Sequence, residues 1–216
     1  RAHHLHLEER VENGNHDKST TISPPYAYLL PTSIQPFLSI ITRHLYTRPN
    51  MFKKCQESVL MQNDHDIEHI VIEDKIGMGS EKANGLFCKN KNRVMGKYVF
   101  MLDDDDIFLT TDFVEDIKRI VHENNSPGLI FVRMLINEEL YPTPVDWKVN
   151  KLYQNHIGTS NVVVRADLWH KYIDYFAEIQ TGDFIFINTI FKTNPTMYWQ
   201  DKLYSKTTRV SRGADE

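Results

Sequence analysis

The stretch Gly96-Lys97-Tyr98-Val99-Phe100-Met101-Leu102-Asp103-Asp104-Asp105-Asp106 joins an apolar run to four consecutive aspartates. A short apolar run of this kind is typical of a strand that is buried on both faces. In open α/β sheets, ligands bind in the crevice just beyond the carboxyl ends of the strands. The stretch therefore predicts a buried strand with a binding site at its end.

The segments around this strand alternate between strand and helix patterns. Strands are expected at 37–41, 67–72, 129–135 and 161–164, and helices at 111–122 and 166–176, with a further helix opened by Arg48-Pro49. This alternation favours an α/β fold with a mainly parallel sheet. Polar residues follow three of the apolar runs, at Thr42-Arg43, Glu73-Asp74 and 103–106. We expect these three strand ends to form one crevice.

The four aspartates bring several like charges close together. If strand geometry continues through them, Asp103 and Asp105 share one face, and Asp104 and Asp106 share the other. Like charges a few ångströms apart resist joint ionisation, and a divalent cation relieves that conflict. Mg²⁺ or Mn²⁺ suits these oxygen ligands, because such ions use one or two carboxylates together with substrate phosphates. The structural alternative is a solvated acidic turn, with Asp106 or Asp112 capping the following helix.

Length and composition favour one folded domain. The 216 residues carry a formal charge of −4, which argues against a broad nucleic-acid surface and leaves nucleic acid out of the expected partners. We expect an N-terminal extension at 1–33 and the folded domain at 34–216. The histidines at 3, 4 and 6 could chelate a metal, but a flexible tail is the commoner explanation. No apolar run reaches the roughly 18 residues of a transmembrane segment, and no secretory signal is evident, so a cytoplasmic location is expected.

Several segments combine into one pattern with the stretch at 96–106. They are Phe37 to Arg43, Arg48-Pro49, Ser58-Val59 with Gln62, and Ile70 to Asp74. The stretch itself looks like the signature Gly-x-Tyr-hydrophobic-Leu-Asp-x-Asp-Asp, and with these segments it resembles the family 2 glycosyltransferases of GT-A fold. The resemblance covers about Pro36 to Gly213. It implies an α/β, Rossmann-like nucleotide-sugar-binding domain with a mainly parallel central sheet flanked by helices.

The resemblance also implies how a donor would be bound. Asp103-Asp104-Asp105 would be the DXD motif, with Asp105 a direct metal ligand and Asp103 near the ribose or the metal. Mn²⁺ or Mg²⁺ would bridge the diphosphate of the donor and stabilise charge on the leaving nucleotide. Glu73 or Asp74 would accept hydrogen bonds from the base. The expected donor-binding residues are thus Thr42, Arg43, Glu73, Asp74, Asp103, Asp104 and Asp105.

Two later segments are similar to segments of the family, the first to one that lines the sugar and acceptor pocket and the second, at 198–201 with 209–213, to the family's closing segment. The first supplies His156, Thr159 and Ser160, although a turn leading into a core strand at 162–164 explains it equally well. The second supplies Trp199. Both segments therefore become candidates for a sugar or acceptor pocket.

Asp183, in Thr181-Gly182-Asp183-Phe184, occupies the place of the family's catalytic acid residue. An inverting transfer needs a carboxylate to take the proton from the attacking hydroxyl. The alternative role of Asp183 is to cap a helix at 184–191, and a helix start both fixes a carboxylate and favours its ionised form. The two roles are compatible.

Parts of the family pattern are missing. No histidine follows His170, so the third metal ligand is open, and the usual Ala-Arg-Asn segment is replaced by 88–93, whose basic residues could contact the diphosphate or form a solvated turn. Gly77 to Lys82 matches no phosphate loop in full and is interpreted as a turn.

Function is expected to be a metal-dependent inverting transfer of a sugar from a nucleoside-diphosphate sugar, with UDP favoured, to a hydroxyl acceptor such as a glycan. A non-catalytic nucleotide-sugar or carbohydrate-binding module is one alternative. A sugar nucleotidyltransferase is another, but 42–46 lacks the glycine-rich loop expected after its first strand. The sugar, the acceptor and the oligomeric state stay open.

Overall fold

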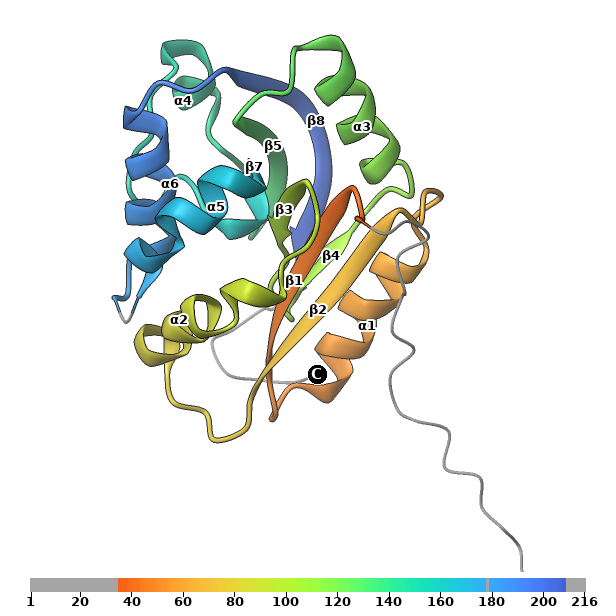
Figure 1. The fold of residues 1–216 in the computed structure, drawn as a ribbon. Helices are drawn as coiled ribbons and strands as arrows, with labels where there is room; N and C mark the ends of the chain where they lie inside the picture. The colour runs from red at the N-terminus through yellow and green to blue at the C-terminus, as the bar shows by residue number, and fades with distance from the viewer. Residues whose placement is uncertain (1–34, 178, 209–216) are drawn as a thin grey trace, which may run out of the picture.

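The computed structural model describes residues 35–177 and 179–208. The expected extension at 1–33 and its histidines, and the closing segment at 209–213, lie outside these residues. The elements follow in the order β1 (Leu38–Leu45), α1 (Pro49–Leu60), β2 (Ile67–Asp74), α2 (Ser80–Lys89), η1 (Lys91–Arg93), β3 (Tyr98–Met101), β4 (Asp106–Phe108), α3 (Phe113–Glu123), β5 (Leu129–Ile136), β6 (Glu139–Tyr141), α4 (Pro144–Val149), η2 (Thr159–Asn161), β7 (Val162–Arg165), α5 (Ala166–Tyr172), η3 (Ile173–Phe176), α6 (Gly182–Lys192) and β8 (Met197–Thr207) (Figure 1).

One mixed sheet runs through the molecule. Its strand order is β2-β1-β3-β7-β5-β8-β4, with β6 paired to β5. β1 is parallel to β2 and β3, and β5 is parallel to β8, but β7 is antiparallel to both β3 and β5. The expectation of a mainly parallel sheet is therefore corrected to a mixed one. The reason is that an apolar run such as Val162-Val163-Val164, buried on both faces, has the same pattern whichever way the strand runs.

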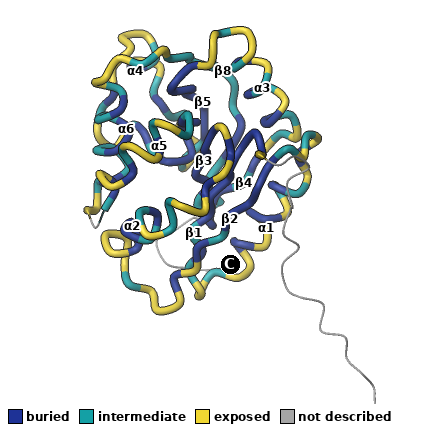
Figure 2. The backbone as a smooth tube through the Cα atoms, viewed as in Figure 1, coloured by how far each residue is buried: buried dark blue, intermediate teal, exposed yellow. Residues whose placement is uncertain are grey.

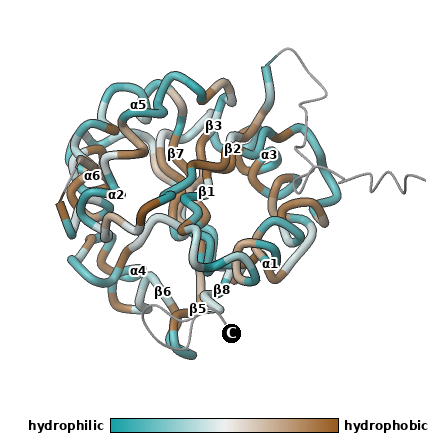
Figure 3. The backbone as a smooth tube through the Cα atoms, turned by 90° about the horizontal axis from the view of Figure 1, so that it is seen from below, coloured by the Kyte–Doolittle hydropathy of each residue, from teal (hydrophilic) through white to brown (hydrophobic). Residues whose placement is uncertain are grey.

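The sheet separates two hydrophobic clusters. Val99 and Met101 of β3 belong to a cluster with Phe87, Trp169 and Phe186 from α2, α5 and α6, whereas alternate residues of β3 face a cluster with α1 and α3. Figure 2 shows these strands as the buried interior of the molecule. Viewed from below, β1 lies between α2 and α6 on one side and α1 on the other (Figure 3). The two-sided burial keeps the ends of β1, β2 and β3 in fixed positions.

The helices differ in part from the sequence expectation. α2 was not expected, because Asn84 and Gly85 are weak helix formers; it forms because one face, including Phe87, packs into the core. The turn at 77–82 therefore ends where α2 begins at Ser80. The expected helix at 111–122 begins at Phe113, and the one at 166–176 ends as α5 at Tyr172 and continues as the 3-10 turn η3.

Folding stability should depend on pH through one buried histidine. His69 Nε2 lies 2.9 Å from Thr42 Oγ1, and burial lowers the pKa of His69 from 6.5 to about 4. Unfolded His69 binds a proton near pH 6.5 and folded His69 only near pH 4, so its stabilising contribution is complete above pH 6.5 and is lost as the pH falls from 6.5 toward 4. The complete loss amounts to about 3 kcal/mol.

Urea unfolding of the wild type and of His69→Gln at a series of pH values measures this loss. The difference between the two free energies of unfolding cancels the titration of other groups. We expect the wild type to lose stability relative to His69→Gln as the pH falls from 6.5 toward 4. A difference that is constant with pH would show that His69 contributes nothing to acid sensitivity.

Candidate functional site

The four aspartates form a turn between β3 and β4. The amide of Asp106 donates to the carbonyl of Asp103 at 3.0 Å, so the strand does not continue through the run. The expected alternation of faces is therefore wrong: Asp103, Asp104 and Asp105 all line one cleft. Strand geometry resumes only at Asp106, which begins β4 rather than a helix.

The cleft has a volume of about 770 Å³ and lies at the carboxyl ends of β1, β2 and β3. Its charged lining residues are Arg43, Arg48, Asp74, Asp103, Asp104, Asp105 and Asp183. Two arginines thus face five aspartates. The cleft carries an excess of negative charge, and a bound cation would reduce it.

Both arginines contact the aspartate turn. Arg48 Nη1 lies 3.1 Å from Asp104 Oδ1 and 3.5 Å from Asp105 Oδ2, and Arg43 Nη2 lies 3.7 Å from Asp103 Oδ1. The sequence assigned Arg48 only to the start of α1. Its position in the β1–α1 loop, at the carboxyl end of β1, is the signal that could have found it.

Asp104 holds the turn to β1. Its Oδ2 accepts the amide of Leu45 at 2.7 Å and lies 3.4 Å from His44 Nδ1. Its side chain is almost completely buried. Asp104 therefore anchors the turn, whereas Asp103 keeps more exposed carboxylate surface toward the cleft.

Two hydroxyl side chains also donate hydrogen bonds to the aspartate turn. Ser160 Oγ donates to Asp106 Oδ2 at 2.6 Å, and Thr159 Oγ1 donates to Asp103 Oδ2 at 3.5 Å. Burial, with the charges of Asp105 and Asp103, raises the pKa of Asp106 well above its usual range. Thr159 and Ser160 thus reach the site through the aspartates and do not line the cleft themselves.

Asp183 lies in the first turn of α6 and lines the same cleft. The N-cap of α6 is Thr181, so the expected capping role of Asp183 is corrected. Its Oδ1 accepts the amide of Phe184 at 2.7 Å. Burial first, and then the negative charge of Asp103, raise the pKa of Asp183, while the Phe184 amide and Arg43 oppose the shift. A carboxylate of raised pKa is suited to accepting a proton.

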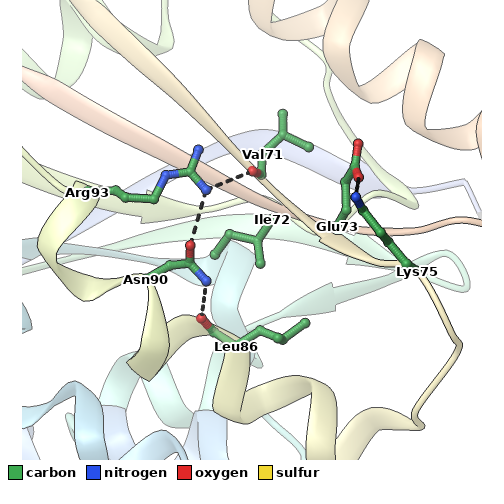
Figure 4. Close-up of a pocket in the computed structure, with 7 residues that line it drawn as sticks. All are labelled: Val71, Ile72, Glu73, Lys75, Leu86, Asn90 and Arg93. Atoms are coloured by element: carbon green, nitrogen blue, oxygen red, sulfur yellow. Dashed lines mark hydrogen bonds and ion pairs between the residues drawn. The ribbon is translucent and has the colours of Figure 1, made fainter.

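The two acidic residues at the end of β2, Glu73 and Asp74, line different hollows. Asp74 lines the cleft, and its Oδ1 accepts the amides of Ile76, Gly77 and Met78 at 3.3, 2.9 and 3.3 Å. Glu73 is exposed and pairs with Lys75 at 3.4 Å. It lines a second hollow of about 330 Å³ beside the edge strand β2, where Arg93 donates to the carbonyl of Val71 (Figure 4).

Three further expected site residues lie away from the cleft. Thr42 is buried against His69, because alternation along β1 points it to the opposite face from Arg43. His156 Nδ1 lies 3.1 Å from Asp146 Oδ2, although its neighbours Asn155 and Ile157 line the cleft. The Trp199 indole donates to Asn150 and its ring stacks on a core phenylalanine.

The carboxylates of the aspartate turn fit a divalent cation that takes most of its ligands from the substrate and only a few from the protein. Among the described residues, no group of three or more histidine, cysteine, aspartate or glutamate side chains is placed to hold a metal ion. Asp103 and Asp105 nevertheless offer carboxylate oxygens in one cleft. Mg²⁺ and related ions often bind through only one or two carboxylates when phosphate oxygens supply the rest.

Comparison with known proteins gives structural but not sequence matches. No protein-family profile matches the chain, and no curated protein sequence does. Within residues 35–177 and 179–208, no helix has the length and apolar composition needed to cross a bilayer.

The fold is similar to that of solved proteins. S. aureus TarS matches with a TM-score of 0.58 and 12% identity over 80% of this chain and 37% of that chain. TarS 1-349 in complex with UDP matches at 0.58 and 11% over 79% of this chain and 60% of that one. The mannosyltransferase PcManGT from Pyrobaculum calidifontis, in complex with GDP-Man and Mn²⁺, matches at 0.60 and 10% over 85% and 60%. The chain spans 37% to 60% of the length of these proteins, and it shares their α/β fold, which is of the GT-A type.

Proposed function

We propose that this chain carries the sugar-donor site and the catalytic base of a metal-dependent inverting glycosyltransferase. The observation that supports this most is the joint position of Asp103, Asp105 and Asp183 in one cleft at the carboxyl ends of the strands. A donor site needs carboxylates for the cation that accompanies a diphosphate, and an inverting transfer needs a further carboxylate for the acceptor proton. The cleft supplies both.

The donor would lie across the aspartate turn. Asp105 and Asp103 would hold a divalent cation, Mn²⁺ or Mg²⁺, which when bound supplies positive charge to the diphosphate. Arg48 and Arg43 contact the same carboxylates and would turn toward phosphate oxygens, since guanidinium groups bind them strongly. Asp74 lines the same cleft and would accept hydrogen bonds from the nucleotide base, although backbone amides already occupy most of its carboxylate.

The transfer step would use Asp183. Its carboxylate takes the proton from the acceptor hydroxyl as that oxygen bonds to the anomeric carbon, and the bond from that carbon to the nucleoside diphosphate breaks. The configuration at the anomeric carbon inverts because attack and departure occur on opposite faces. The domain responsible is proposed to be 34–216, and a glycan hydroxyl is the proposed acceptor.

A donor hydrolysis screen tests the function. UDP-, GDP- and TDP-sugars are incubated with the protein and Mn²⁺, with EDTA and protein-free controls. UDP is favoured by the sequence resemblance, and GDP belongs in the screen because PcManGT was solved with GDP-Man. Release of nucleoside diphosphate from one donor class, abolished by EDTA, is expected. Binding without any release would instead favour a non-catalytic nucleotide-sugar-binding module.

A further inference from the structure

We propose that Asn84 is a positioning residue that couples the donor side of the cleft to Asp183. The inference rests on the proposed function, because it assigns Asn84 to the geometry of the same transfer. Asn84 lies in α2 and is only 6% exposed. Asn84 takes no direct part in the proposed chemistry. Its amide oxygen and its amide nitrogen nevertheless form hydrogen bonds to two different sides of the site.

One amide atom faces the donor side. Asn84 Oδ1 accepts Nη1 of Arg43 at 2.7 Å, and the other terminal nitrogen of Arg43 lies 3.7 Å from Asp103 Oδ1. A long arginine side chain has many rotamers, and a buried acceptor at this distance selects among them. Asn84 therefore fixes the direction from which Arg43 approaches the aspartate turn.

The other amide atom of Asn84, its nitrogen, faces the segment that carries the proposed catalytic base, Asp183. Asn84 Nδ2 donates to the carbonyl of Ile179 at 2.7 Å, and the same carbonyl accepts the amide of Gly182 at 3.0 Å. Gly182 directly precedes Asp183, and a Cβ on Gly182 would stand 2.5 Å from the carbonyl oxygen of Phe176. The turn at 179–182 is therefore closely packed, and the hydrogen bond from Asn84 sets where α6 begins.

The two contacts together make one connection from Asp103 through Arg43 and Asn84 to the turn before Asp183. An amide side chain suits it, because its oxygen can accept from a guanidinium while its nitrogen donates to a carbonyl at a different position. Misplacing a catalytic group by about 1 Å costs on the order of 100-fold in rate. The connection would therefore affect the transfer step more than donor binding.

Asn84→Asp cuts this connection at one end only. The new carboxylate keeps the shape of the side chain and still accepts from Arg43, but it cannot donate to Ile179 and repels that carbonyl. We expect kcat for donor hydrolysis or transfer to fall about tenfold to 100-fold, with the donor KM nearly unchanged. Backbone amides at 182–185 should exchange faster with deuterium, because Gly182 and its neighbours lose their fixed turn.

Asn90→Asp is the matched control. Asn90, at the end of α2, also donates to a carbonyl, that of Leu86 at 2.8 Å, and accepts from an arginine, Arg93, at 3.2 Å. It lines the hollow beside β2 instead of the cleft. The same substitution there should leave both kcat and the exchange at 182–185 at wild-type values. Equal effects of the two variants would overturn the proposal.

Hydrogen exchange separates this proposal from the proposed function. If the wild type releases no nucleotide from any donor, the proposed function fails, while exchange at 182–185 still tests the connection. Wild-type exchange in Asn84→Asp overturns the connection even if the enzyme is active. Should Asn84→Asp fail to fold, the uncharged Asn84→Ala, which can neither donate nor accept, takes its place, with the same faster exchange expected and wild-type exchange counting against the proposal.

Discussion

Asp183→Asn should lower kcat for sugar transfer by about 10²- to 10⁴-fold while leaving donor affinity close to that of the wild type. The asparagine keeps the shape of the side chain but cannot take a proton from the acceptor hydroxyl. In the proposed function, donor binding depends on the aspartate turn and its arginines, whereas the hydrogen bond that Asp183 makes is to the amide of Phe184. Steady-state kinetics together with calorimetric titration of Mn²⁺ and nucleoside diphosphate measures the two effects separately.

The pH profile and the stability of this variant provide its controls. Burial raises the pKa of Asp183, so wild-type activity should fall as the pH drops through that raised value, at a higher pH than for an ordinary aspartate. A raised folded-state pKa also means that the ionised carboxylate disfavours folding near neutral pH. Asp183→Asn should therefore melt no lower than the wild type, and unchanged kcat in this well-folded variant would exclude Asp183 as the base.

Asp105→Asn should abolish the stabilisation that Mn²⁺ and a nucleoside diphosphate give to the folded protein. The neutral amide is a poor ligand for a hard cation, so affinity falls by an order of magnitude or more. Without ligand the variant should melt near the wild-type temperature, because relief of the crowding among the aspartates offsets the loss of the 3.5 Å contact with Arg48. Thermal unfolding with and without the ligands measures both effects.

Asp104→Asn is the comparison variant for this experiment. Asp104 accepts the amide of Leu45 and pairs with Arg48, so the loss of its charge should lower the melting temperature in the absence of any ligand. The two neighbouring substitutions are thus expected to differ in the ligand-free protein, where Asp104→Asn lowers the melting temperature and Asp105→Asn does not. A loss of ligand response in Asp104→Asn alone would move the metal-binding role away from Asp105.

Much of the candidate site could be predicted, because binding residues in α/β sheets gather at the carboxyl ends of the strands. Arg43, Asp74 and Asp103 each follow an apolar strand, and parallel pairing of β1 with β2 and β3 brings those three ends together. Thr42 lies outside the cleft although it is adjacent to Arg43, because successive residues of a strand face opposite sides. The strand end could be predicted, but which of two neighbours faces the ligand depends on register.

The remaining features depend on contacts between distant segments. The place of Arg48 at the carboxyl end of β1 marks it as a candidate, but its pairing with Asp104 is not contained in the local sequence pattern. The same holds for the pairing of Asn84 with Ile179, and only the fold brings these pairs together. The turn of the aspartate run could be named only as an alternative to continued strand geometry, because four identical residues carry no signal of where a strand ends. The direction of β7 was missed for a similar reason, since an apolar run has no polarity.

Thermal unfolding of the wild-type protein with Mn²⁺ and each of UDP, GDP and TDP tests the central claim, that the cleft at Asp103 to Asp105 binds a nucleoside diphosphate with a divalent cation. At a ligand concentration about 100 times the dissociation constant, the free energy of unfolding should rise by about 2.7 kcal/mol. The rise should require metal and nucleotide together and disappear with EDTA. No rise with any of the three nucleotides in the presence of Mn²⁺ would contradict the assignment.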